Sequence, residues 1–162
     1  MTRRSAIATL ALVFALVAPA LWAAASPEGF WLNQEGTSIV RIAQTGGKLS
    51  GRIVWLKEPN YPAGDSQGRA GKPKVDEHNP TPAEREHKLL GMYILWGFSA
   101  PDGSGVCEGG RIYDPRNGKT YSATMSIDGN DRLNLRGYIM VSMIGRTNVW
   151  TRVDPGKYGL TP

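Results

Sequence analysis

Apolar and polar residues alternate along most of the chain that follows residue 26. In the clearest stretch, 119–127, the apolar residues Tyr121, Ala123 and Met125 are separated by serine and threonine. This spacing is typical of a strand that buries one face and exposes the other. The same pattern predicts about eight strands, near 29–33, 38–43, 48–56, 92–98, 106–113, 119–127, 132–140 and 147–153.

Short connections between these segments predict hairpins. The turns at 45–47, 114–118 and 128–131 are rich in Gly, Asn and Asp, which accept turn dihedrals. Sequential strands joined in this way favour a meander that closes on itself. We therefore predict an all-β fold, a small antiparallel up-and-down β-barrel of about eight strands with one short helix. A β-sandwich is the alternative, because periodicity fixes faces and not closure.

Residues 57–91 interrupt the alternating pattern with several prolines, glycines and charges. A loop of this length in a small domain is usually functional or mobile. Thr81, Pro82 and Glu84 match the start of a helix, and Gly91 matches its end. We predict a short helix over about 82–90.

The N-terminus has the pattern of a secretory signal. Arg3 and Arg4 precede an uncharged apolar run of about a dozen residues, which is too short to cross a bilayer as a permanent helix. Small residues follow, and we place cleavage after Ala25. The prediction is a signal peptide over 1–25 and one β-barrel domain over 26–162, periplasmic or secreted and without a membrane span.

Composition and charge exclude some classes of protein. The chain has a formal net charge of +5, but Lys and Arg are dispersed and form no basic run. We therefore expect no nucleic-acid binding. Cys107 is the single cysteine, so no internal disulfide can form. A small buried hydrophobic residue is its favoured interpretation, and a reactive thiol is the alternative.

The titratable residues predict neither a metal site nor a cofactor site. Besides carboxylates the chain offers His78, His87 and Cys107, and no zinc, calcium or P-loop spacing occurs. No serine has a histidine partner that the sequence can assign, although such partners can converge in space. We name no catalytic residue, and whether the protein is an enzyme stays open.

A polar cluster on the loop over 57–91 is a candidate binding site. Asp76, Asn79 and Arg85 supply a carboxylate, an amide and a guanidinium that could line a polar mouth. The alternative is turn chemistry, in which Asn79 caps a turn and Asp76 pairs with a nearby base. For Asp114, which opens a hairpin turn, a structural role is favoured over catalysis.

Four tryptophans lie beyond residue 26: Trp31, Trp55, Trp96 and Trp150. They are large for so small a core, and one interpretation is that they fill the barrel interior. The other is an aromatic pocket for an apolar or sugar ligand. Trp55 and Trp96 join Asp76, Asn79 and Arg85 as candidate ligand-binding residues.

The assembled sequence resembles the bacterial family known as domain of unknown function 2147. The segments that carry the resemblance are Gly29-Phe30-Trp31, Leu49-Ser50-Gly51-Arg52-Ile53, Asp76 with Asn79-Pro80, Leu90-Gly91 before Ile94-Leu95, Gly109-Gly110-Arg111-Ile112-Tyr113-Asp114-Pro115 with Gly118-Lys119-Thr120-Tyr121, Leu135-Arg136-Gly137-Tyr138, and Trp150-Thr151-Arg152. Cys107 departs from the family pattern, which commonly has tryptophan there. The resemblance implies an exported protein without an established activity.

A fainter resemblance is to lipocalin-like barrels, which often begin with Gly-x-Trp and cover that tryptophan with an arginine of the last strand. Trp31 and Arg152 are the matching residues. The resemblance implies that they meet at the barrel floor as a structural pair.

Two functional hypotheses follow. The first is an exported envelope protein that binds a small apolar or amphipathic molecule in the barrel mouth beneath the loop over 57–91. The second is an enzyme that acts on cell-envelope material through the polar residues of this loop.

Overall fold

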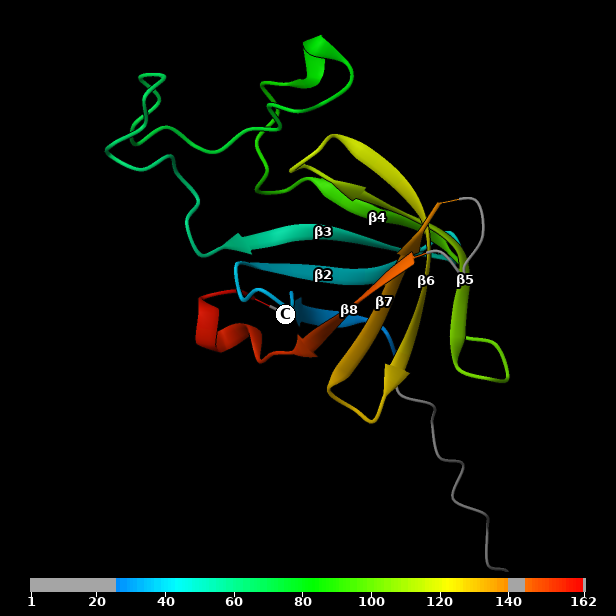
Figure 1. The fold of residues 1–162 in the computed structure, drawn as a ribbon. Coiled ribbons are helices and arrows are strands. Elements are labelled where there is room, and N and C mark those ends of the chain that lie inside the picture. The colour runs from blue at the N-terminus through cyan, green and yellow to red at the C-terminus, as the bar shows by residue number, and fades with distance from the viewer. Residues whose placement is uncertain (1–25, 140–144, 162) are drawn as a thin grey trace, which may run out of the picture.

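A computed structural model describes residues 26–139 and 145–161 and shows one closed antiparallel barrel (Figure 1). Each strand pairs with its neighbour along the chain. The strands are β1 (Gly29–Leu32), β2 (Ser38–Thr45), β3 (Lys48–Leu56), β4 (Tyr93–Phe98), β5 (Val106–Asp114), β6 (Lys119–Asp128), β7 (Arg132–Tyr138) and β8 (Gly145–Arg152). Every predicted strand is present. The predicted leader over 1–25 and residue 140 of the seventh predicted strand lie outside the described residues.

The barrel closes where β1 meets β8. Trp31 lies opposite Arg152 and Leu32 opposite Thr151, while the other side of β1 pairs with β2. Because the first and last strands share this seam, the sheet has no free edge. The up-and-down barrel is therefore confirmed, and the sandwich alternative is wrong, since it requires two separate sheets.

Arg152 covers the indole of Trp31 at this seam. Its guanidinium carbon lies 4.2 Å from the ring centroid. Its Nε and Nη1 groups each donate to a backbone carbonyl at 2.7 Å, of Asn130 and Glu28, and Nη2 donates to that of Ser26 at 2.5 Å. The predicted contact is present, and it also ties the start of the barrel to its last strand.

Buried side chains from all the strands fill the barrel interior. They form one cluster: Trp31, Val40, Ile42, Leu49, Ile53, Ile94, Leu95, Phe98, Cys107, Tyr113, Ala123, Met125, Leu133, Leu135 and Trp150. A barrel of about eight strands is just wide enough for side chains to fill it. Gly110 shows how closely they pack, because a Cβ atom there would lie 2.2 Å from the Phe98 ring. The interior is thus a solid core.

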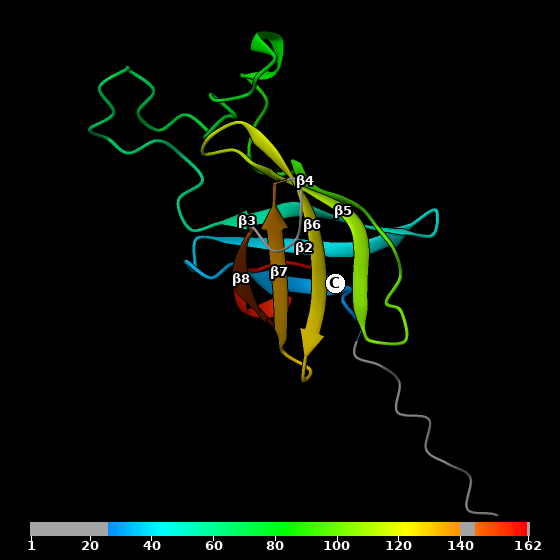
Figure 2. The same ribbon diagram turned by 45° about the vertical axis from the view of Figure 1, so that its right-hand side comes forward.

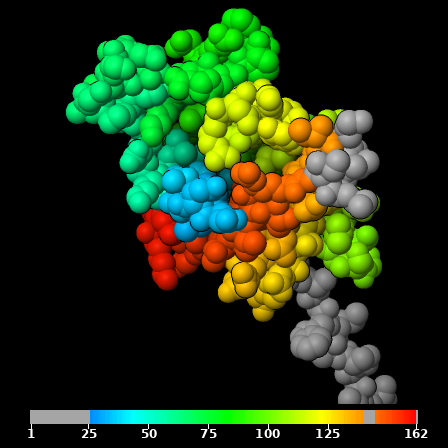
Figure 3. Space-filling view, viewed as in Figure 1, coloured from blue at the N-terminus to red at the C-terminus, as the bar shows by residue number. Residues whose placement is uncertain are grey.

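The segment between β3 and β4 stands away from the barrel wall (Figure 2). In the space-filling view it forms a raised lobe above the strands (Figure 3). We call residues 57–92 the long loop. In its first half the chain turns back on itself. The N–H of Tyr61 donates to the carbonyl of Lys72 at 2.9 Å, and Asn60 and Pro73 form an isolated antiparallel β-bridge. The long loop therefore has hydrogen-bonded order of its own.

The predicted helix over 82–90 is wrong. Only a single 3₁₀ turn, η1 (Pro82–Glu84), forms there, and the Thr81 side chain makes no capping hydrogen bond. The chain beyond it bonds across the loop instead, because the N–H of Leu89 donates to the carbonyl of Lys74 at 3.0 Å. A backbone group that bonds across the loop cannot also continue a helix.

In the described part of the chain, no helix is long and apolar enough to span a membrane.

Candidate functional site

A buried polar cluster joins the long loop to the barrel. Asp76 of the loop is 0% exposed, and its carboxylate oxygens lie 2.9 and 2.8 Å from the hydroxyl of Tyr113 near the end of β5. The Asn79 side-chain amide donates to the same carboxylate at 2.7 Å. We call these three residues the clasp. Neutral donors satisfy its carboxylate, as a buried carboxylate requires.

The turn between β5 and β6 shapes the place where the loop docks. Gly118 closes this turn with a φ of 68°, and a Cβ atom there would lie 1.9 Å from the carbonyl oxygen of His78. Only glycine permits both this backbone conformation and this close approach. Asp114 opens the turn and accepts the backbone N–H of Arg116 at 3.0 Å.

Charge and burial in this region favour a structural role for these residues, docking of the long loop onto the barrel, over a catalytic role. Burial, together with the hydrogen bond to Asp76, raises the pKa of Tyr113, so its hydroxyl stays protonated and donates. The hydrogen bond from the Arg116 side chain lowers the pKa of Asp114. Because the Asp76 carboxylate is fully buried and already bonded, the clasp acts as an anchor for the loop.

A pocket of about 590 Å³ lies within the long loop. We call it the loop pocket. Tyr61, Pro73 and Val75 form the apolar part of its lining. The charged part comprises basic and acidic side chains: Arg69, Lys72, Arg85, Lys88, Glu77 and Glu86. This volume falls in the range of small-molecule sites, which combine apolar walls with a few polar groups.

Arg69 organises one wall of the loop pocket. Its guanidinium carbon lies 3.9 Å from the centre of the Tyr61 ring. It binds Asp65 through Nε at 3.2 Å and Nη2 at 2.8 Å, and it also pairs with Glu77. The bond from Arg69 lowers the pKa of Asp65 to about 2. Arg69 is thus committed to the loop's own structure.

Three other cations of the loop pocket have no such partner. Among residues 26–139 and 145–161, Lys72, Arg85 and Lys88 form no ion pair. Arg85 donates through Nε to the carbonyl of Asn79 at 2.9 Å. The remaining N–H groups of these side chains are available to an anion.

Comparison with known proteins identifies the family of the chain. The family described as "Uncharacterized protein conserved in bacteria (DUF2147)" matches residues 29–152. The chain belongs to this family. The matched region starts at the first strand and ends at Arg152, so it covers the whole barrel and the long loop.

A solved structure supports the fold of this DUF2147 protein. A Helicobacter pylori protein described as belonging to the lipocalin family aligns with a TM-score of 0.66 and 23% identity. The alignment covers 82% of this chain and 86% of that chain. The barrel is therefore lipocalin-like. The comparison with curated proteins gives no match.

The structure brings some of the predicted site residues of this DUF2147 protein together and separates others. Asp76, Asn79 and Arg85 are linked by the bonds given above. Trp55 instead packs edge-on against Tyr158 of η2 (Pro155–Tyr158), with ring centroids 5.1 Å apart. Trp96 lies on β4 with 39% exposure and pairs in register with Arg111 of β5.

Sequence reasoning missed Tyr113 and Arg69. Tyr113 lies in the Gly-Arg-Ile-Tyr-Asp-Pro segment that carries the family resemblance, which was the available signal for it. Arg69 stands in a glycine-rich stretch without periodicity, and only its spacing of four from Asp65 hinted at a pair.

The cysteine and histidines of this DUF2147 protein do not assemble a metal site. Burial raises the pKa of the Cys107 thiol to about 11, in keeping with a small hydrophobic core residue. His87 pairs with Glu84 at 2.7 Å on the surface. Within the described residues no group of three or more His, Cys, Asp or Glu side chains could hold a metal ion.

Proposed function

We propose that this DUF2147 protein is an exported binding protein that takes a small amphipathic anion into the loop pocket. The observation that carries the proposal is the joint presence of apolar walls and unpaired cations around a volume of about 590 Å³. An apolar portion of the ligand would pack against Tyr61, Pro73 and Val75. Its anionic group would lie among Lys72, Arg85 and Lys88.

The charge balance of the loop pocket supports an anionic ligand. Its lining has four basic side chains and two acidic ones. One of these acids, Glu77, already pairs with Arg69. The net positive charge attracts anions.

The barrel supports the loop pocket and leaves little room for a ligand of its own. Lipocalin barrels can hold one small ligand inside, and the lipocalin-like fold is the reason to favour binding as the kind of function. In this chain the interior is occupied by large side chains such as Trp31, Phe98 and Trp150. The ligand is therefore assigned to the loop, outside the barrel.

Export is supported by the sequence alone. The basic head, the apolar run and the small residues before Ser26 are the features of a cleaved signal. An enzyme acting through the polar loop residues stays the alternative. The Asp76 carboxylate, which such an enzyme would use, is fully buried in the clasp.

Titration of the purified protein with dodecanoate, followed by two-dimensional NMR, tests the proposed ligand class. We expect saturable shifts at residues 61, 72, 75, 85 and 88. Lys72→Glu combined with Lys88→Glu should weaken binding by at least about tenfold, because two attractive contacts become repulsive. Lys157→Glu, an exposed control on η2, should leave it unchanged.

Either of two outcomes would contradict the proposal. Shifts centred on the interior residues Trp31 and Phe98 would place the ligand inside the barrel. Equal loss of binding in the Lys157→Glu control would mean that the weaker binding comes from the change in net charge and not from the loop pocket. Native mass spectrometry of protein purified without denaturation adds an independent search for a natural ligand.

A further inference from the structure

Two arginines lie directly opposite each other on the outer wall of the barrel. Arg41 of β2 pairs in register with Arg52 of β3. The next pair in the ladder, Ile42 and Gly51, faces the interior, where Ile42 belongs to the buried core. Since side chains alternate across a strand, Arg41 and Arg52 both point outward.

Aromatic residues continue this row across the neighbouring strands. Phe30 of β1 lies opposite Arg41, and Tyr93 of β4 lies opposite Arg52. The Arg41 guanidinium carbon lies 5.5 Å from the centre of the Phe30 ring, which holds that side chain against the wall. Tyr93 is 58% exposed, so much of its surface is open to a ligand.

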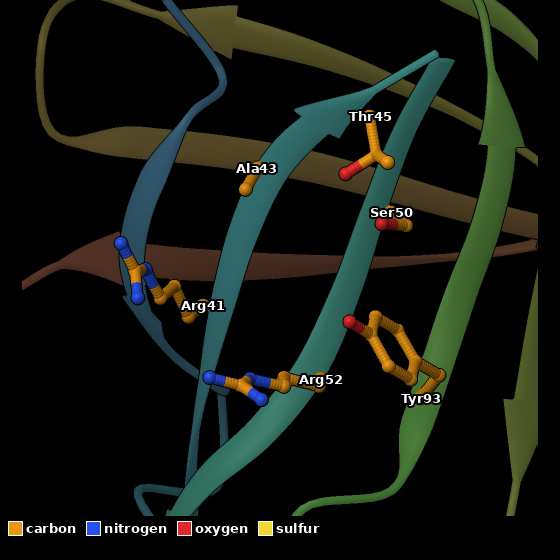
Figure 4. A pocket seen from close by; sticks show the side chains of 6 residues that line it. All are labelled: Arg41, Ala43, Thr45, Ser50, Arg52 and Tyr93. Carbon is orange, nitrogen blue, oxygen red and sulfur yellow. The ribbon is translucent and has the colours of Figure 1, made fainter.

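The arginine pair borders a hollow of about 230 Å³ on the outer wall (Figure 4). Thr45, Ser50 and Tyr93 bring hydroxyl groups to its lining, which Ala43 completes. Every polar side chain of this lining can donate a hydrogen bond, and none of them is a carboxylate. The hollow is therefore lined for an acceptor that carries negative charge.

Neither arginine is neutralised by the protein. In the described ranges, 26–139 and 145–161, Arg41 and Arg52 form no ion pair. Glu28, which precedes β1 on the same side of the sheet, accepts the N–H of Gln44 at 3.2 Å instead. The arginines Arg69 and Arg116 are by contrast paired with carboxylates.

Like charges placed directly opposite each other destabilise a sheet. The Arg41–Arg52 pair therefore weakens the barrel unless an anion lies between the two guanidinium groups. An arginine fork matches the oxygen geometry of a phosphate group through paired hydrogen bonds. The hydroxyl groups of Thr45 and Ser50, farther along the hollow, can bond other oxygens of the same ligand.

We infer that this outer hollow is a phosphate-binding site, independent of the loop pocket. Arg41 and Arg52 bind the phosphate group at one end of the hollow, Thr45 and Ser50 donate to oxygens of the organic portion that carries it, and Tyr93 packs against that portion. The phosphate belongs to a soluble phosphate ester or to the headgroup of a phospholipid, since both present the same group.

The first experiment titrates glycerol 3-phosphate into the purified protein and follows the NMR signals of the backbone and the arginine side chains. We expect saturable shifts confined to residues 41, 45, 50, 52 and 93. No variant is needed for this readout, so the folding of a variant cannot confuse it. Shifts spread over the surface, or centred on the loop pocket, would overturn the inference.

The second experiment compares Arg41→Gln/Arg52→Gln with Arg111→Gln. The double variant should lose at least about tenfold in affinity for glycerol 3-phosphate, a loss typical of removing charged hydrogen bonds. It should remain folded, because the repulsion between the two charges is removed as well. Arg111→Gln, an exposed position on β5, should stay within about twofold of the parent. Equal losses in both proteins would overturn the inference.

A third measurement separates the two sources of the phosphate group. The protein is sedimented with vesicles of phosphatidylglycerol in phosphatidylcholine and with vesicles of phosphatidylcholine alone. Pelleting with the anionic vesicles that depends on Arg41 and Arg52 identifies a lipid headgroup. Saturable binding of glycerol 3-phosphate without pelleting identifies a soluble ester. Failure of both probes would overturn the site and leave the loop pocket untouched.

Discussion

The barrel and the long loop are stabilised by different forces, although they belong to one chain. The barrel buries an apolar cluster contributed by all its strands and closes its hydrogen-bond ladder. From the long loop, Met92 at its end packs against that cluster. The rest of the loop is organised by Arg69 and its partners Asp65, Glu77 and Tyr61. Burial of apolar surface depends little on pH or salt, whereas exposed ion pairs depend on both.

This contrast separates the part that determines the fold from the part to which we assign the proposed ligand. The exposed polar side chains of the long loop lie outside the packed interior, so we expect their replacement to leave the barrel core intact. The clasp of Asp76, Asn79 and Tyr113 is the buried link between the two parts. Changes on either side of the clasp should therefore have distinct effects.

The largest effect is expected from Arg152→Ala, which acts on the barrel. The variant loses the contact with Trp31 and hydrogen bonds to three backbone carbonyls. The free energy of unfolding should fall by roughly 1–3 kcal/mol, measured by chemical denaturation. Arg152→Lys should recover only part of it, because an ammonium group lacks the flat surface and the fork. An Arg152→Ala protein as stable as the parent would contradict this role.

A smaller and local effect is expected from Tyr113→Phe, which acts on the clasp. The buried Asp76 carboxylate loses its hydroxyl donor but keeps the Asn79 amide, so the free energy of unfolding should fall by about 1 kcal/mol, the lower end of the range for such a loss. Hydrogen exchange should speed up in the long loop more than in β6 and β7. Tyr138→Phe, a half-buried position on β7, is the matched control. Equal acceleration throughout the barrel would mean that Tyr113 serves only the core.

The smallest effect is expected from protonation of Asp65, which acts on the long loop. The pKa of Asp65 is lowered from 3.8 to about 2 by Arg69, so the carboxylate binds Arg69 fully above about pH 4. This contribution should disappear as the pH falls through about 2. The protection factors of residues 61–72, which correct for the pH dependence of exchange in an unstructured chain, should then fall between pH 4 and pH 2.

Asp65→Asn sharpens this acid prediction. The variant should exchange quickly in the long loop at every pH and lose the acid-dependent step. Asp128→Asn, at an exposed position at the end of β6, should leave the step unchanged. The same acid step in the Asp65→Asn protein would assign it to another carboxylate.

The barrel could be predicted from the sequence because its signals are local or follow from closure. Alternation in a segment such as 119–127 identifies a strand without knowledge of its partners. The contact between Trp31 and Arg152 was implied by the resemblance to lipocalin-like barrels, and the pairing of the first strand with the last gives its physical reason. Tertiary contacts did not override the local strand pattern, so the strands formed where alternation predicted them.

The clasp and the loop could not be predicted in the same way. Tyr113 and Asp76 are 37 positions apart, and no period relates a residue of an irregular loop to a strand. The helix over 82–90 failed because cross-loop bonds such as that between Leu89 and Lys74 replaced its local ones. The loop pocket depends on these bonds, so its residues became visible only in three dimensions.

The seam between β1 and β8 also fixes the order in which the molecule can be completed. Arg152 bonds to Glu28 and Ser26, which precede it by 124 and 126 positions. A chain emerging from the ribosome therefore cannot close the barrel until Arg152 has been made. Contacts between such distant positions form slowly. Until then β1 lacks its β8 partner, and one edge of the sheet stays unpaired during synthesis.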